Sequence, residues 1–174
     1  MTTVHNICKH AYFIESDTEN ILSEAWLEDV IETNPFSECE PDRTPFLLIG
    51  ENIFIEGDNK KYCIDSLYLS PSGQIVIAEA NPFRSEISCD AVLQQIDRYI
   101  EKLKSWNYEK LNSIAYDFTY KKRGQAFNII DLFAEKGYAT FSDEENLIKV
   151  INDNLENADF LIFLVGDEIK LTKK

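Results

Sequence analysis

The sequence contains no long hydrophobic run and no patterned set of cysteines. No apolar stretch approaches the roughly 20 residues that a membrane-spanning helix requires. The first ten residues, MTTVHNICKH, lack the basic and then apolar form of a secretory signal. The four cysteines are widely spaced without a C-x-x-C pair, which disfavours a disulfide framework and a zinc ribbon. We therefore expect a cytoplasmic protein with no membrane partner.

Basic residues are also few: 17 Lys and Arg stand against 31 Asp and Glu, a formal net charge of -14. Such a surplus argues against a nucleic-acid partner, because phosphates bind basic surfaces. The surplus is local, however. Residues 15–58 hold thirteen acids and one base, Arg43, whereas the other residues hold eighteen acids and sixteen bases, a net of only -2. Two partners stay open: DNA, or a basic protein that binds the acidic region 15–58.

The chain of 174 residues is long enough for one domain with its own core. Capping boxes, apolar periodicity and breakers predict its elements in order. These are a helix over 16–34, a strand over 46–55 interrupted at Gly50, a hairpin over 62–81, a helix from about 88 to 103, a short helix from 108, a basic loop at 121–123, helices over 124–136 and 142–155, and a central strand over 159–165. The basic loop is either solvated or in contact with phosphate.

The hairpin over 62–81 consists of two apolar strands around a Pro-Ser-Gly turn that ends at Gly73. A three-residue loop takes a type I turn followed by a residue in the left-handed region, which is the role we assign to Gly73. This geometry pairs Ser70 with Gln74 and fixes the register of both strands.

Counting back from that pair places Asp65 directly opposite Glu79, with β-carbons about 5 Å apart. Two carboxylates side by side on a half-buried face repel each other unless a positive charge compensates them. A divalent cation held by oxygen ligands would supply that charge. Alternatively, one or both carboxylates point into solvent at a strand end. A two-residue loop would shift the register by one and send the acids to opposite faces.

The helix that begins near Ser88 carries Gln95 and Tyr99 four residues apart, and therefore on one face, with Arg98 and Lys102 beside them. An amphipathic helix with an ordinary mixed flank explains these residues equally well.

Four segments occur in a characteristic order: the acidic helix SEAWLEDVIETNP, the hairpin I-D-x(n)-G-x-I-V-I-A-E-A-N, a helix with Q-x-x-x-Y, and the late strand ADFLIFLVGDEI. Together they resemble the PD-(D/E)xK nuclease superfamily, in the branch with a Q-x-x-x-Y helix behind the metal site. The resemblance is best over residues 20–105. It implies an α/β fold of the restriction-endonuclease-like type, with a mixed central β-sheet of about four strands flanked by helices. A single domain would then span 1–174, with a core over 16–105 and late elements over 106–166, as a whole protein or as the N-terminal part of a longer one.

The resemblance also implies Mg²⁺- or Mn²⁺-dependent hydrolysis of DNA. Four residues would supply the metal ligands: the carboxylates of Asp65 and Glu79, the carbonyl of Ala80, and Glu24 from the first helix, directly or through water. Gln95 and Tyr99 would support the site or touch the nucleic-acid backbone.

The sequence departs from the family at Asn81, which stands where the family has the lysine that orients the attacking water. Asparagine donates a hydrogen bond but carries no positive charge. Three alternatives are open: Asn81 suffices beside the metal; a base elsewhere replaces the lysine; or hydrolysis is lost and the fold serves as an acidic protein-interaction module. The candidate replacement bases are Lys102, Arg98 and Arg84.

Overall fold

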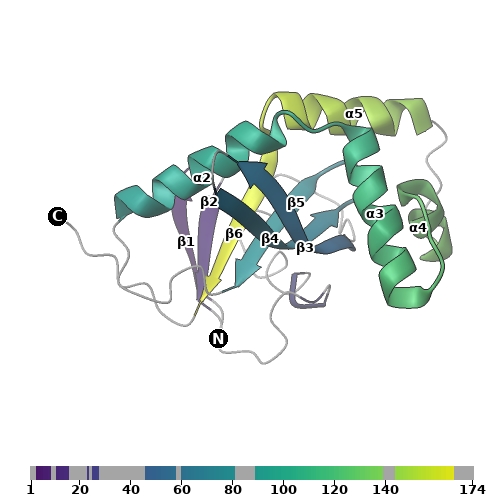
Figure 1. Cartoon of the computed structure of the whole chain (residues 1–174), viewed down its shortest axis with the longest axis horizontal. Helices are drawn as coiled ribbons and strands as arrows, with labels where there is room; N and C mark the ends of the chain where they lie inside the picture. Colours follow the sequence, from purple (N-terminus) through teal and green to yellow (C-terminus); the bar gives the residue numbers. More distant parts are fainter. Residues whose placement is uncertain are drawn as a thin grey trace.

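The computed structural model describes residues 3–8, 11–15, 23, 25–27, 46–57, 60–80, 89–138 and 144–166 (Figure 1). In chain order the elements are β1 (Thr3–Cys8), β2 (Ala11–Glu15), β3 (Leu47–Gly57), β4 (Lys60–Leu69), β5 (Ile75–Ala80), α2 (Cys89–Leu103), α3 (Tyr108–Arg123), α4 (Ile129–Glu135), α5 (Glu144–Glu156) and β6 (Phe160–Gly166).

The strands form one mixed sheet in the order β1-β2-β6-β5-β4-β3. Strands β3, β4 and β5 are successively antiparallel, and β6 lies parallel to both β5 and β2. The α/β class and the mixed sheet agree with expectation, but the expected count of about four strands is wrong, because β1 and β2 add two more. Strand β6 is apolar on both faces; β5 pairs with one of its edges and β2 with the other.

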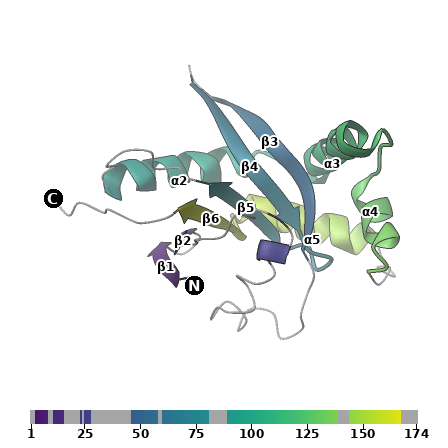
Figure 2. The same cartoon turned by 90° about the horizontal axis from the view of Figure 1, so that it is seen from below.

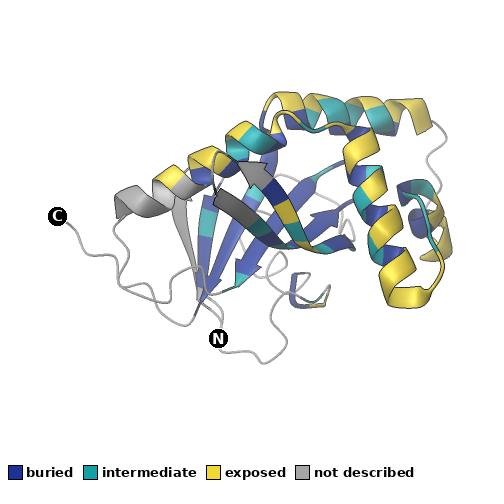
Figure 3. Cartoon of the chain, viewed as in Figure 1, coloured by how far each residue is buried: buried dark blue, intermediate teal, exposed yellow. Residues whose placement is uncertain are grey.

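Two apolar clusters cover the two faces of the sheet (Figures 2 and 3). The larger cluster packs helices α2, α3, α4 and α5 against one face, and the smaller one packs Trp26 and Leu27 against the other. Strand β6 contributes Ile162 to the first cluster and Phe163 to the second. The prediction of a central strand buried on both faces is therefore confirmed.

The predicted basic loop at 121–123 is instead the last turn of α3, which is a 16-residue helix rather than a short one. Cationic side chains favour this position because they face the negative end of the helix dipole. Gly124 ends the helix in the left-handed conformation (φ 71°), and its N–H donates to the carbonyl of Tyr120. The next helix, α4, begins at Ile129 rather than at Gly124, after the N-cap Asn128.

Two predicted helix starts lie mainly outside the described residues. Of the helix expected over 16–34, the structure describes a helical turn at 25–27, where the Ser23 hydroxyl accepts a hydrogen bond from the Trp26 amide at 3.1 Å. The capping residue Ser142 is likewise outside the described ranges, although α5 itself follows as expected. None of the helices that the structure describes has the length and apolar character needed to cross a bilayer.

Candidate functional site: two carboxylates on adjacent strands

The turn between β4 and β5 has the predicted geometry. Gly73 adopts a positive φ of 88°, and the amide of Ser70 donates to the carbonyl of Gln74 at 2.9 Å. The ladder then runs from Leu69–Ile75 to Ser66–Ala78. Helix α5 holds the turn in place, because Asn154 donates from Nδ2 to the carbonyl of Gly73 at 2.9 Å. The predicted register is confirmed.

Continued by one residue, this register brings Asp65 of β4 opposite Glu79 of β5. The carboxylate of Asp65 also links the two strands directly: its Oδ2 accepts a hydrogen bond of 2.8 Å from the amide of Ala80. A hydrogen bond from a backbone N–H to a charged carboxylate is stronger than one to a neutral acceptor. The side chain of Asp65 is therefore fixed to the backbone of β5 at Ala80, the residue next to Glu79.

Glu79 is buried, with 4% of its surface exposed. The pKa of Glu79 is raised from 4.5 to about 7. Burial is the main cause; a hydrogen bond from the Tyr99 hydroxyl lowers the pKa, and the negative charge of Asp65 raises it. Near neutral pH the side chain therefore exchanges a proton readily. Such a group serves as a proton donor, a proton acceptor or a cation ligand.

Cys63 is a neighbour of the two acids that was not predicted as a site residue. It lies two residues before Asp65 on β4. Burial raises the pKa of its thiol, and the charges of Asp65 and Glu79 both add to the effect. The sequence signal was available, since Cys63 alternates with Asp65 in the strand.

The other predicted site residues belong to α2 or lie outside the described residues. Tyr99 is buried on the inner side of α2 and reaches Glu79, as expected for a supporting residue. Lys102 follows three residues later in the last turn of α2 and is half-buried. Gln95 belongs to the same helix, but its side chain lies outside the described set, as do Asn81 and Glu24.

The donor set of the described residues fits a hard cation only in part. Among these residues, no group of three His, Cys, Asp or Glu side chains is placed to hold a metal ion. Two carboxylates and the Ala80 carbonyl are all oxygen donors, which suit Mg²⁺. Magnesium is often held by only one or two protein carboxylates, with waters and substrate phosphates completing its octahedron. The two acids therefore match the oxygen ligands of Mg²⁺ in kind, but by themselves they do not form a site held wholly by protein.

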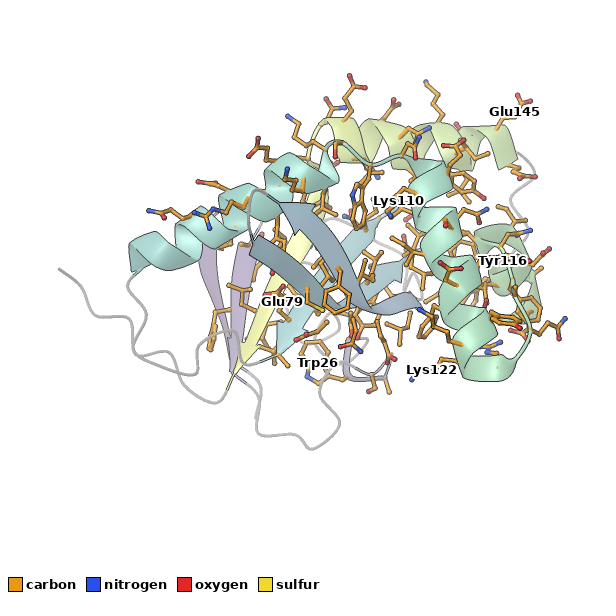
Figure 4. The ribbon with its side chains drawn as sticks, viewed as in Figure 1. Trp26, Glu79, Lys110, Tyr116, Lys122 and Glu145 are labelled. Carbon is orange, nitrogen blue, oxygen red and sulfur yellow. The ribbon has the colours of Figure 1, made fainter. Side chains whose placement is uncertain are left out.

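Two of the three basic residues at the end of α3, Lys122 and Arg123, are engaged in ion pairs. Lys122 pairs with Glu51 of β3 at 2.8 Å, and Arg123 pairs with Glu135 of α4. Figure 4 places Lys122 well apart from Glu79. Both pairs join α3 to neighbouring elements, which favours a structural role for Lys122 and Arg123 over phosphate binding at the carboxylate site.

Comparisons with models of protein families, with curated proteins and with solved structures found no match.

Proposed function

We propose that this chain is a nuclease-like domain that hydrolyses DNA phosphodiester bonds with Mg²⁺ or Mn²⁺. The observation that carries the proposal is the placement of Asp65 and Glu79 on adjacent strands, one residue beyond the last ladder pair, with Ala80 bonded to Asp65 and Tyr99 behind Glu79. This is the arrangement that the resemblance to PD-(D/E)xK nucleases implies for the metal-binding acids.

The strand arrangement supports the same proposal. The four strands that the sequence predicted are neighbours in the sheet, in the order β3-β4-β5-β6, with β6 parallel to β5. Glu79 lies near the carboxyl end of β5, beside Leu164 of β6. Ligands commonly bind at the carboxyl ends of parallel strands. We therefore assign the domain to a restriction-endonuclease-like fold as part of the proposal.

The two acids have different roles in the proposed reaction. When bound, a divalent cation would polarise the scissile phosphate and acidify a water molecule. Asp65, fixed by the Ala80 amide, provides a preorganised carboxylate oxygen. Glu79 must release its proton to act as a ligand, and the Tyr99 hydrogen bond favours the ionised form.

The positive charge that the family takes from lysine must come from elsewhere, because position 81 is asparagine. We propose Lys102 as its source. It lies three residues after Tyr99 on α2, so the two residues are neighbours on the helix surface. The ammonium group would offset the charge that develops on the phosphate.

Titration calorimetry of Mn²⁺ and Mg²⁺ into the full chain tests the metal site, with cleavage of labelled single-stranded and duplex DNA as the second readout. We expect binding and cleavage in the wild type, loss of both in Asp65→Ala, and no change in Asp117→Ala, an exposed acid on α3. Absence of metal binding in the wild type would contradict the proposal.

Two further variants test the source of the positive charge. Lys102→Met is expected to lower the cleavage rate while leaving metal affinity intact, and Asn81→Lys in the same background is expected to restore cleavage. If Lys102→Met cleaves as the wild type does, Lys102 has no such role and Asn81 suffices beside the metal.

A second function is supported by the local net charge of -12 over residues 15–58 and by the missing lysine. In this alternative the fold is catalytically inactive and binds a basic protein through its acidic region. Such binding would weaken steeply with salt. A chain that binds Mg²⁺ and cleaves DNA would exclude the inactive alternative.

A further inference from the structure

We propose that Phe54 is a stacking platform for an unpaired base, and that the substrate is accordingly single-stranded or locally unpaired DNA. The inference rests on the nuclease function proposed above and names its substrate class. Its starting point is one apolar side chain in a place where folding alone gives no reason for it.

Phe54 is a phenyl ring with 67% of its surface exposed on the edge strand β3. The β3–β4 hairpin extends beyond the other strands of the sheet (Figure 2). The other exposed large hydrophobic residues of the described chain, Tyr116 and Tyr120, lie on α3 and carry a polar hydroxyl that water can solvate. Phe54 has no such group, so its exposure costs free energy without contributing to the core.

The register of the hairpin places this ring beside the carboxylate pair. Phe54 is the direct partner of Cys63, so both side chains are on the same face of β3 and β4. Asp65 follows two residues after Cys63 on β4. Cys63 lies between them and is within electrostatic reach of both Asp65 and Glu79. A phosphate at the acids would therefore bring a base of the same strand within reach of the ring.

A second residue near Asp65 supports a substrate contact. The pairs Glu51–Ser66 and Ile53–Ile64 bracket Asn52 and place it opposite Asp65. Asn52 is exposed and has a positive φ of 51°, a conformation that is strained for most residues but tolerated by asparagine. Its amide can donate to and accept from the edge of a base. A base could stack on the aromatic face of Phe54 and form hydrogen bonds with the side-chain amide of Asn52.

The choice of an unpaired base follows from accessibility and charge. Inside a duplex both faces of each base are covered by neighbours, so stacking on protein requires an unstacked nucleotide. The chain is acidic, and Lys122 and Arg123 of α3 are held by carboxylates, so phosphate attraction is weak. Stacking supplies affinity that does not depend on basic residues. Binding should therefore depend less on salt than is usual for DNA-binding proteins.

The test measures binding of the full chain to labelled oligodeoxynucleotides by fluorescence anisotropy, in Ca²⁺ in place of Mg²⁺ so that the probes are not hydrolysed. Three probes are used: a single strand, the corresponding duplex, and the single strand with one abasic residue scanned through it. The variants are Phe54→Ala, Phe54→Trp and, as a matched exposed aromatic control remote from Glu79 (Figure 4), Tyr116→Ala. Thermal melts verify folding, which an exposed substitution should leave intact.

We expect the wild type to bind the single strand more tightly than the duplex. Phe54→Ala should weaken single-strand binding about 5- to 150-fold, the range expected for one stacked base. One abasic position should reproduce that loss in the wild type but add nothing in Phe54→Ala. Phe54→Trp should retain affinity, and Tyr116→Ala should behave as the wild type.

The possible failures are distinguishable. If the wild type cleaves DNA in an Asp65-dependent manner but Phe54→Ala binds and cleaves every probe normally, the stacking inference is wrong and the nuclease function stands. If single strands bind through Phe54 but no variant hydrolyses them, the stacking inference stands and hydrolysis fails. If the wild type binds no DNA at all, both are overturned, and Phe54 is left as a contact for another protein.

Discussion

The carboxylate of Asp65 accepts a hydrogen bond of 2.8 Å from the backbone amide of Ala80, the residue that follows Glu79. One side chain thus serves both the structure and the proposed site, and substitutions can separate the two roles. We expect Asp65→Asn to keep the hydrogen bond and most of the stability while losing affinity for Mg²⁺. Asp65→Ala should lose both, with a decrease in unfolding free energy of about 1–3 kcal/mol. Denaturant unfolding and metal titration of the two variants, side by side, test this. Equal metal affinity in Asp65→Asn and the wild type would remove the carboxylate from the metal site.

Glu79 makes stability depend on pH. Its carboxyl titrates near 4.5 in the unfolded chain and at about 7 in the fold. Between these values the folded protein keeps a proton that the unfolded chain has lost, so raising the pH lowers the free energy of unfolding. The total decrease is about 3 kcal/mol at most and is complete above the folded pKa. Glu79→Gln should abolish it and be the more stable protein at pH 8.

Denaturant midpoints measured from pH 4 to pH 8 check this prediction. Glu145→Gln, a change at an exposed acid on α5, is the control and should retain the wild-type dependence. An identical pH dependence in the wild type and Glu79→Gln would show that Glu79 ionises at its ordinary value.

Metal binding should also depend on the ionisation of Glu79. Because Glu79 must ionise to coordinate a cation, Mg²⁺ affinity should rise between pH 6 and pH 8, and each binding event should release part of a proton. Tyr99→Phe removes the hydrogen bond that lowers the pKa of Glu79, so the rise in affinity should move to higher pH. Calorimetry in two buffers of different ionisation enthalpy measures the released protons. An affinity that is flat across this range would contradict Glu79 as a ligand.

Gly73 is the residue on which the register of both acids depends. Its φ of 88° is strained for an L-residue, and a β-carbon there would lie 2.8 Å from Cγ1 of Val150 on α5. Gly73→Ala should therefore cost about 2–4 kcal/mol, from conformational strain and overpacking together. Gly124→Ala is a matched control, because Gly124 also has a positive φ (71°) but nothing lies within 4 Å of the added carbon. It should cost only about 1 kcal/mol.

A double variant separates the two components of this cost. Val150→Ala should make Gly73→Ala less damaging by relieving the contact, whereas it should not alter the cost of Gly124→Ala. Thermal or chemical unfolding of the set gives the coupling free energy. Equal costs at the two glycines would show that α5 yields to the added methyl group.

The sequence was sufficient for the features that local chemistry determines. The hairpin register followed from the single requirement for a left-handed residue at Gly73, and the apolar run of β6 was enough to place it as a central strand. The prediction of a loop at 121–123 was wrong because Lys and Arg are common both in loops and in the last turn of a helix. Only Gly124 indicated where the helix ends. Strands β1 and β2 were missed: they pair with each other, and only β2 joins them to the sheet, through β6, about 150 residues away.

In the candidate site too, local features were predicted from the sequence and features set by tertiary packing were not. Asp65 and Glu79 are joined by a short turn, so their proximity could be counted along the chain. Tyr99 meets Glu79 through tertiary packing of α2, which the spacing of Gln95 and Tyr99 suggested only by resemblance. Phe54 is placed by its pairing with Cys63 across a different turn. Neither its exposure nor its neighbourhood can be deduced from an apolar residue in a strand.

The position of β6 also constrains how the protein is made. In the described sheet, the β1–β2 pair and the β3–β4–β5 meander share no hydrogen bonds with each other, and both are joined to β6. On the ribosome the two halves must therefore wait, each with an unsatisfied edge, until residues 160–166 have emerged. Contacts so distant in sequence make folding slow and leave exposed strand edges open to aggregation in the interval. We therefore expect the sheet to be completed only after β6 has been synthesised.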